Sequence, residues 1–313
     1  MKFLKIGGII FLILILTAGG GLAWLCFSDL PHYEVKNVTY TVHSTPEKVA
    51  RGKKLASMLC YNCHVNFETG KLTGREMKDA PEFGFIYAQN ITQDPQYGIG
   101  SWTDAELMYL LRSGINRHGR YVPPYMPKLP HMADTDIESI IAFLRSDDPM
   151  VASVAIPDKP CRPSLLTKFL SRVAFKPLPL PEKAVTIPDS SDKIAYGKYL
   201  VINLDCWTCH SASFQELNIM EPEKTKGYLG GGNPIKDDAL NVIVSANITP
   251  HPSSGIGKWS EEKFIRALKT GTVDGRALRY PMIPYTHLTD AEAAAMYAYL
   301  KTVPPIDNKV TKN

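Results

Sequence analysis

Two pentapeptides carry side chains that can hold a metal-containing group, residues 60–64 (CYNCH) and 206–210 (CWTCH). The pattern C-x-x-C-H is the signature of covalent attachment of a c-type haem. In this chemistry the two sulfurs bond one edge of the porphyrin, and the histidine supplies a nitrogen ligand to the iron. The sequence therefore predicts two covalently bound haem c groups. The predicted attachment residues and proximal iron ligands are Cys60, Cys63, His64, Cys206, Cys209 and His210.

Two other chemistries use paired cysteines. A zinc site built from both pairs would have to join two separate repeat units, and it would leave His64 and His210 without a role. A redox-active dithiol needs no following histidine and usually belongs to a βαβ unit. Haem attachment explains all of these residues, so we expect haem at both motifs.

The second axial ligand of each iron is expected from a methionine that recurs at an equivalent place, Met126 and Met282. A methionine thioether is a soft ligand, and His/Met ligation raises the haem potential. Prolines lie beside both methionines and stiffen the loop that must hold the sulfur at the iron. His131 and His287 also recur and remain the alternative, although they stand just before the last helix, where capping or packing is expected. The predicted iron ligands are His64, Met126, His210 and Met282.

The two haem motifs belong to an internal duplication. Asn90-Ile91-Thr92 recurs as Asn247-Ile248-Thr249, and the Gly-Ile-Gly-x-Trp segment at 98–102 recurs at 255–259. These landmarks keep their order in both copies. The chain therefore contains one kind of domain twice.

Helix signals agree between the copies. The first helix of each copy leads into the cysteine pair, with a capping box at Ser44-x-x-Glu47 in the first copy and possible caps at 189–191 in the second. A middle helix begins at Thr103 and its counterpart at Ser260. No convincing alternating strand appears, which predicts an all-α fold class. The middle helices are expected to end at Gly114 and Gly271. The last helices are expected to span residues 134–145 and 290–301.

A glycine precedes each cysteine pair, Gly52 in the first copy and Gly197 in the second. The last helices carry Phe143 and Tyr299 at equivalent places. A glycine that faces an aromatic ring would let the first and last helices cross closely, so a structural role is expected for both glycines.

Residues 6–28 form an uncharged stretch of 23 positions between Lys5 and Asp29. A helix of this length reaches about 35 Å, enough to cross the ~30 Å hydrocarbon core of a bilayer. Lysines precede the stretch and acidic residues follow it, so the positive-inside rule predicts a cytoplasmic N-terminus. We expect an uncleaved membrane anchor. A cleaved signal peptide is the alternative, but the stretch is long for one and no clear A-x-A cleavage site is seen.

Composition agrees with a folded chain of about two domains. The chain has 313 residues, of which 44% are apolar and 21% charged, close to globular averages. A net charge of +4 is too weak to suggest nucleic-acid binding. Seven prolines between residues 157 and 188 predict an extended linker between the copies. The expected segments are a transmembrane anchor at 1–30, a first domain at 45–150, a proline-rich linker at 151–189 and a second domain at 190–305.

Each half resembles a class I cytochrome c domain, with C-x-x-C-H near its start, a methionine later and a closing helix. The Asn-Ile-Thr and Gly-Ile-Gly-x-Trp segments narrow the resemblance to the cytochrome c subunits of membrane-bound alcohol and gluconate dehydrogenases. The resemblance covers about residues 45–150 and 190–305. It implies two tandem cytochrome c domains, with His64 and His210 as proximal ligands and Met126 and Met282 as distal ligands.

The resemblance implies a membrane-anchored di-haem cytochrome that transfers single electrons and is not itself an enzyme. The expected partners are a dehydrogenase or quinol-oxidising complex upstream and an oxidase or soluble cytochrome downstream, as in a respiratory chain; nucleic acid is not expected. The expected location is the bacterial inner membrane, with the haem domains in the periplasm. The alternative is a di-haem cytochrome c peroxidase, which needs an open distal face and an acid/base group at one haem. Both halves keep a methionine instead, which favours the electron carrier.

Overall fold

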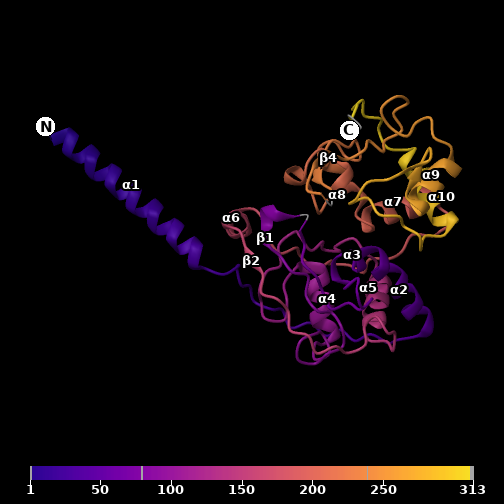
Figure 1. Ribbon diagram of the computed structural model, residues 1–313, viewed down its shortest axis with the longest axis horizontal. Coiled ribbons are helices and arrows are strands. Elements are labelled where there is room, and N and C mark those ends of the chain that lie inside the picture. Colours follow the sequence, from indigo (N-terminus) through magenta and orange to yellow (C-terminus); the bar gives the residue numbers. More distant parts are fainter. Residues whose placement is uncertain (1, 79, 238, 311–313) are drawn as a thin grey trace.

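The structure, a computed structural model, describes residues 2–78, 80–237 and 239–310. One long helix projects from a body in which the first repeat (45–150) and the second repeat (190–305) lie together (Figure 1). The α-helices are α1 (Lys2–Phe27), α2 (Pro46–Leu59), α3 (Tyr61–His64), α4 (Asp104–Ser113), α5 (Asp134–Leu144), α6 (Leu165–Val173), α7 (Lys193–Asn203), α8 (Cys206–His210), α9 (Glu261–Thr270) and α10 (Asp290–Leu300). The 3-10 helices are η1 (Pro81–Phe83), η2 (Phe214–Glu216) and η3 (Pro222–Lys224). The strands are β1 (Gly84–Phe85), β2 (Arg162–Pro163), β3 (Pro234–Lys236), β4 (Val242–Val244), β5 (Thr272–Val273) and β6 (Arg276–Ala277).

The first and last helices of each repeat cross at very close range, α2 against α5 and α7 against α10. A Cβ on Gly52 would lie 1.7 Å from the carbonyl oxygen of Ser139 in α5. A Cβ on Gly197 would lie 1.9 Å from the carbonyl oxygen of Ala295 in α10. The structural role predicted for both glycines is confirmed. In both repeats, however, the closest neighbour is a backbone carbonyl rather than an aromatic ring; Phe143 approaches Gly52 with its Cβ at 2.9 Å, and Tyr299 is not among the nearest atoms to Gly197.

The middle helices have the predicted boundaries. Thr103 and Glu106 form the capping box of α4, which ends at Gly114 with a left-handed φ of 80°. In α9 the hydroxyl of Ser260 accepts a hydrogen bond from the Lys263 N–H, and the helix ends at Gly271 with φ of 66°. Two other caps lie one residue from their predicted places. Thr45, not Ser44, caps α2, and Asp192 caps α7.

Short antiparallel strand pairs are present in the described part of the chain, and an all-α prediction does not include them. β1 pairs with β2, β3 with β4 and β5 with β6. Each strand has two or three residues, too short to show an alternating pattern in the sequence. The pairs fasten loops around a core that the helices build.

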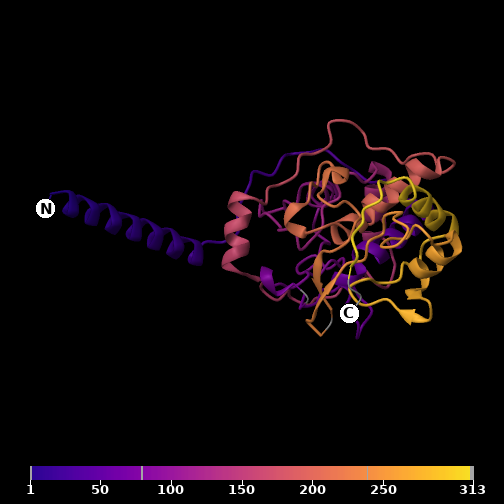
Figure 2. The ribbon, with the colours of Figure 1, turned by 90° about the horizontal axis from the view of Figure 1, so that it is seen from above.

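The linker is not extended throughout, because it contains β2 and α6. β2 pairs with β1 of the first repeat, so the linker is attached to that repeat. Within the described residues, Lys5–Phe27 forms a helix long and apolar enough to cross a membrane. Figure 2 shows α6 between the end of this helix and the body, running across the direction of α1.

The two repeats meet through buried polar contacts of their first and last helices. Tyr199 in α7 donates its hydroxyl proton to Asp136 in α5 at 2.6 Å. Lys54 in α2 donates to Glu292 in α10 at 2.6 Å. Asp136 and Glu292 are both the third residue of their helices and both are buried, so the contact has approximate two-fold symmetry. Arg51 binds Asp136 within the first repeat at 2.8 Å and also pairs with Glu292 of the second repeat at 3.6 Å.

Candidate haem sites

Each C-x-x-C-H motif forms a tight helical turn directly after the first helix of its repeat. In the first repeat, Cys60 ends α2, and its carbonyl accepts the N–H of His64 at 2.9 Å. In the second repeat, Asp205 adopts a left-handed conformation with φ of 61° and starts α8. Both turns bring two thiols and an imidazole together on five consecutive residues. This is the grouping that thioether attachment with proximal ligation requires.

A backbone carbonyl orients each motif histidine. His64 Nδ1 donates to the carbonyl oxygen of Gln89 at 2.8 Å. His210 Nδ1 donates to the carbonyl oxygen of Ala246, also at 2.8 Å. Burial lowers the pKa of both imidazoles below the ordinary value. Because Nδ1 carries the proton, Nε2 keeps its lone pair, and this neutral tautomer is the form that binds iron.

The repeated Asn-Ile-Thr segment holds these carbonyls in place. Gln89 and Ala246 stand directly before it. The side-chain oxygen of Asn90 accepts bonds from the N–H and hydroxyl of Thr92 at 2.9 and 2.7 Å. Asn247 accepts the same two bonds from Thr249, at the same distances. The segment is therefore a hydrogen-bonded turn, and the residue directly before it accepts the bond from the motif histidine.

The Gly-Ile-Gly-x-Trp segment packs onto this turn. Ile99 donates its N–H to the Thr92 carbonyl at 2.8 Å, and Ile256 donates to the Thr249 carbonyl at 2.9 Å. A Cβ on Gly98 would lie 2.2 Å from the Thr92 carbonyl oxygen. In each repeat, the Asn-Ile-Thr segment and the Gly-Ile-Gly-x-Trp segment thus form a single support for the motif histidine.

Three of the four motif cysteines have raised pKa values, which favour the neutral thiol. They form no disulfides. Burial raises the pKa of Cys60 to about 12, with a smaller contribution from Cys63. Burial also raises the pKa values of Cys206 and Cys209 to about 12. A reactive dithiol or a zinc thiolate needs a lowered pKa, so these environments favour neither. Among the described residues no group of three His, Cys, Asp or Glu side chains is placed to hold a metal ion.

Met126 lies half-buried against the core, on a loop that two cations hold. Lys128 donates to the carbonyl oxygens of Val122, Pro123 and Met126 at 2.5, 2.8 and 2.9 Å. Burial lowers the pKa of Lys128 to about 7. Three carbonyl acceptors match the three N–H donors of an ammonium group and favour the charged form.

The second cation is Arg112, which is buried in α4. Its guanidinium donates to the carbonyl oxygens of Leu129 and Met132 at 2.8 and 2.6 Å, and to Asp134 at 2.6 Å. The chain from Met126 to the start of α5 is thereby fixed at both ends. A fixed loop suits a methionine that must present its sulfur to iron.

Met282 is also half-buried against the core. Three residues later, Tyr285 donates its hydroxyl proton to the carbonyl of Leu204 at 3.3 Å, just before the second motif. Burial raises the pKa of Tyr285, and the thiols of Cys206 and Cys209 raise it further. The structure therefore brings the methionine loop of this repeat to its cysteine pair. The grouped thiols and the oriented Nε2 fit a covalently bound haem.

The two sites differ in charge. Lys128 has Pro284 as its counterpart, and each packs on the glycine that ends the middle helix. Asp205 has Leu59 as its counterpart directly before the first cysteine. Burial raises the pKa of Asp205 to about 7. The first site thus has a partly buried lysine beside its methionine loop, and the second a partly buried aspartate beside its cysteine pair.

The alternative histidine ligands have other surroundings. His131 Nε2 donates to the carbonyl of Ile219 at 2.7 Å, a contact between the repeats. His287 is exposed. These positions favour Met126 and Met282 as the distal ligands.

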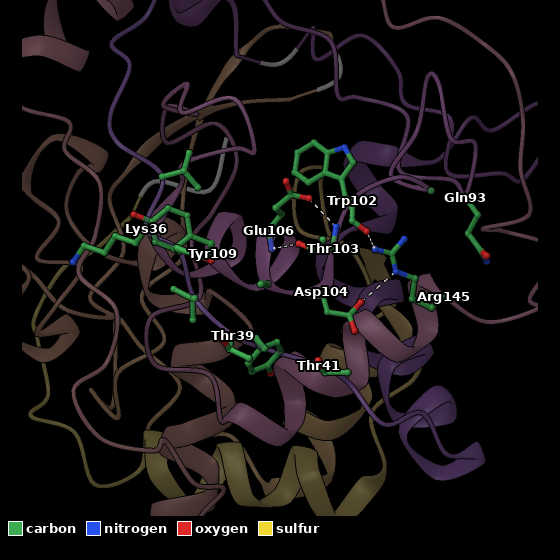
Figure 3. A pocket seen from close by; sticks show the side chains of 16 residues that line it. Lys36, Thr39, Thr41, Gln93, Trp102, Thr103, Asp104, Glu106, Tyr109 and Arg145 are labelled. Carbon is green, nitrogen blue, oxygen red and sulfur yellow. Dashed lines mark hydrogen bonds and ion pairs between the residues drawn. The ribbon is translucent and has the colours of Figure 1, made fainter.

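A groove of about 870 Å³ lies between residues 35–41 and the start of α4 (Figure 3). None of the eight predicted haem residues lines it. Arg145 lines the groove and donates to the carbonyls of Ile99 and Trp102. Arg145 also pairs with Asp104 at 3.4 Å. These contacts stabilise the wall of the groove, and Trp102 is part of that wall.

The sequence analysis did not identify the residues that support the ligands. Gln89 and Ala246 act through their carbonyls, so their side chains carry no signal. Their position before a repeated Asn-Ile-Thr segment is the only sequence sign. Lys128 could not be recognised from the duplication, because its counterpart in the second repeat is a proline, Pro284.

Comparisons with known proteins agree with the geometry. The family profile described as cytochrome c matches residues 49–147 and 194–304. The chain is 30% identical over 265 residues to the cytochrome c subunit of a quinone-dependent alcohol dehydrogenase from Gluconacetobacter polyoxogenes, covering 79% of this chain and 54% of that protein. It is 29% identical to a fructose dehydrogenase cytochrome subunit from Gluconobacter japonicus, covering 82% and 52%. It is 28% identical to a di-haem c-type cytochrome from Cereibacter sphaeroides, covering 95% and 97%.

These findings confirm the resemblance inferred from the sequence. The chain spans about half the length of the dehydrogenase subunits that it matches. It spans nearly the whole of the di-haem cytochrome.

Proposed function

Because the chain belongs to the cytochrome c family, we propose that it is a membrane-anchored di-haem c-type cytochrome that carries single electrons. The observation that carries this proposal is the duplicated C-x-x-C-H turn whose histidine is held by a backbone carbonyl. The full-length similarity to a di-haem cytochrome supports the count of two haems.

The chain's own residues have simple tasks in this proposal. Cys60, Cys63, Cys206 and Cys209 fix the porphyrin edges. His64 and His210 present Nε2 to iron, while Met126 and Met282 supply the soft sixth ligands. Bound haem would supply the one-electron iron couple. If these residues supply two ligands to each iron, no position would be left there for a substrate.

The arrangement of segments follows from the same proposal. Residues 1–30 form the anchor, 45–150 and 190–305 form tandem cytochrome c domains, and 151–189 link them. The buried contacts between α2, α5, α7 and α10 support a fixed distance between the two haems. A fixed distance suits electron exchange between the haems.

The partners are proposed from the relatives. Several are named as cytochrome subunits of alcohol, fructose or gluconate dehydrogenases. We therefore assign a dehydrogenase or quinol-oxidising complex as electron donor and an oxidase or soluble cytochrome as acceptor. The haem domains would lie in the periplasm of a bacterium, held to the inner membrane by α1. The peroxidase alternative draws no support from these relatives.

The test uses the haem-loaded full chain. We expect two covalent haems per chain, each taking up one electron reversibly in a redox titration, without turnover of hydrogen peroxide. Replacing both Cys60 and Cys63 with serine should remove one haem and keep the other. The control variant Cys161→Ser, outside both motifs, should keep both. A single covalent haem in the parent protein, or rapid peroxide turnover, would contradict the proposal.

A further inference from the structure

Helix α6 buries polar side chains and exposes apolar ones, which is the reverse of an ordinary surface helix. Thr167 and Ser171 point into the body and are 2% and 0% exposed. Large apolar side chains point outward instead. A surface helix normally buries its apolar stripe and exposes its polar face. The outward apolar residues and their exposed fractions are Leu165 (44%), Leu166 (54%), Phe169 (49%) and Val173 (58%).

The inward face of α6 is fixed to the first repeat. Thr167 donates its hydroxyl proton to the carbonyl oxygen of Phe83 at 3.1 Å. Ser164, the N-cap, donates to the carbonyl oxygen of Glu82 at 2.6 Å. The pairing of β1 with β2 lies directly before the helix. The outward direction of the apolar face is therefore built into the fold.

The same helix is tied to the end of α1. Lys168 donates to the carbonyl oxygen of Cys26 at 2.7 Å. Arg172 donates to the hydroxyl of Ser28 at 2.8 Å and to the carbonyl of Asp29 at 2.6 Å. Its guanidinium also lies over the ring of Trp24, 4.7 Å from the centroid. α6 thus lies where a bilayer crossed by α1 would end, and Figure 2 shows it running across α1, parallel to such a surface.

We propose that α6 lies in the surface of the phospholipid bilayer, with its apolar face among the upper acyl chains. This inference rests on the proposed role of α1 as the membrane anchor. Interfacial helices of this kind bury their apolar face about 5–10 Å into the headgroup and acyl boundary. Lys168, Arg172 and Lys176 flank the face and can meet headgroup phosphates. A lipid surface therefore fits both the apolar stripe and the basic edge.

The consequence concerns the orientation of the body. The chain after α1 is fastened to the first repeat, because Tyr33 donates its N–H to the Gly119 carbonyl oxygen at 2.7 Å and Arg120 pairs with Asp29 at 2.9 Å. The contact of α6 with the bilayer would add a second point of attachment. It holds the first repeat at the bilayer and the two haem sites at fixed heights. A cytochrome that exchanges electrons with a membrane-bound partner benefits from this fixed orientation.

The experiment measures how fast single cysteines react with a membrane-impermeant, charged maleimide. The haem-loaded full chain is placed in vesicles of phosphatidylcholine and phosphatidylglycerol. Cys26 and Cys161 are first replaced by serine, and the haem thioethers are inert. The probe variant is Phe169→Cys. The matched control is Phe214→Cys, because both phenylalanines are about half exposed on the body, 49% and 48%. Each variant must keep the visible haem spectrum of its parent.

We expect Phe169→Cys to react at least tenfold more slowly than Phe214→Cys. Equal rates would overturn the proposal for α6. A third variant, Leu14→Cys in α1, separates the two proposals. If Leu14→Cys reacts as fast as Phe214→Cys, the anchor itself fails. If Leu14→Cys is protected while Phe169→Cys is not, the anchor stands and only the α6 inference is wrong.

Discussion

Two imidazoles owe their orientation to carbonyls supplied by a turn that is distant in sequence. The covalent motif could be recognised from the sequence because all of its chemistry lies in five consecutive residues. The supporting turn could not, because every residue has a carbonyl and only the fold selects which one meets His64 or His210. The assignment of Met126 and Met282 to iron stays a prediction, supported by the way their loops are held.

The asparagine of the supporting turn should be strongly stabilising. Asn247→Ala removes the acceptor of two Thr249 bonds and the donor to the Ile306 carbonyl at 2.7 Å. Leaving these buried groups unpaired should lower the free energy of unfolding by about 2–4 kcal/mol. Denaturant unfolding followed by haem absorbance measures this. The control Asn241→Ala changes an exposed side chain bonded to Asp237 at 3.2 Å and should cost less than about 0.5 kcal/mol. Equal losses in both variants would contradict the assigned role.

Lys128 should position the loop that carries Met126. Lys128→Met keeps the apolar stem but removes the donor to three carbonyls. We expect the oxidised first haem to lose part of its methionine ligation, seen as a weaker sulfur-to-iron charge-transfer band and new high-spin absorbance. Lys53→Met, which removes an exposed lysine paired with Asp148, should leave the band intact. An unchanged band in Lys128→Met would show that the loop keeps its conformation without the Lys128 bonds.

At the scale of elements, local chemistry predicts most of the helices. The capping box at Thr103 and the left-handed Gly114 mark both ends of α4 as the sequence suggests. The short strands could not be foreseen, because two or three residues show no periodicity. The helix α6 was not predicted from the sequence, for another reason. Its inward residues, Thr167 and Ser171, are polar, so its pattern does not match that of a core-facing helix.

The crossing of α2 and α5 depends on the missing side chain of Gly52. An exchange of glycine for alanine in a helix normally stabilises it by about 1 kcal/mol. Gly52→Ala should instead destabilise the protein by at least about 3 kcal/mol, because its Cβ would meet the Ser139 carbonyl oxygen at 1.7 Å. The reverse exchange at the exposed neighbour, Ala50→Gly, should cost only about 1 kcal/mol. Thermal unfolding compares the two, and a more stable Gly52→Ala would refute the close crossing.

At the scale of the whole molecule, the union of the two repeats was not visible in the sequence. Lys54 and Glu292 are 238 residues apart and neither lies in a motif. Only the folded chain brings their helices together.

Burial raises the pKa of Glu292, but the bonds from Lys54 and from the Thr289 N–H outweigh it and hold the pKa below its ordinary value. A carboxylate with a lowered pKa stabilises the fold above the unfolded pKa and loses this effect as the pH falls.

Glu292→Gln should therefore destabilise the protein by about 2–3 kcal/mol at pH 7, because Lys54 loses its charged partner. The gap between variant and parent should narrow as the pH falls below the ordinary glutamate value of 4.5. Unfolding free energies measured from pH 7 to pH 3 test this. Glu138→Gln, which breaks a more exposed pair within the first repeat, should cost less than about 1 kcal/mol. A gap that stays constant with pH would contradict the charge-based contact.

The central claim is that two haems are each bound by one histidine and one methionine. The most direct measurement is the electron paramagnetic resonance spectrum of the fully oxidised, haem-loaded full chain, alone and with Met126→Ala or Met282→Ala. We predict two low-spin signals of His/Met type, of which each variant loses a different one. A substantial high-spin signal in the parent protein, or a bis-histidine signal from either haem, would contradict it.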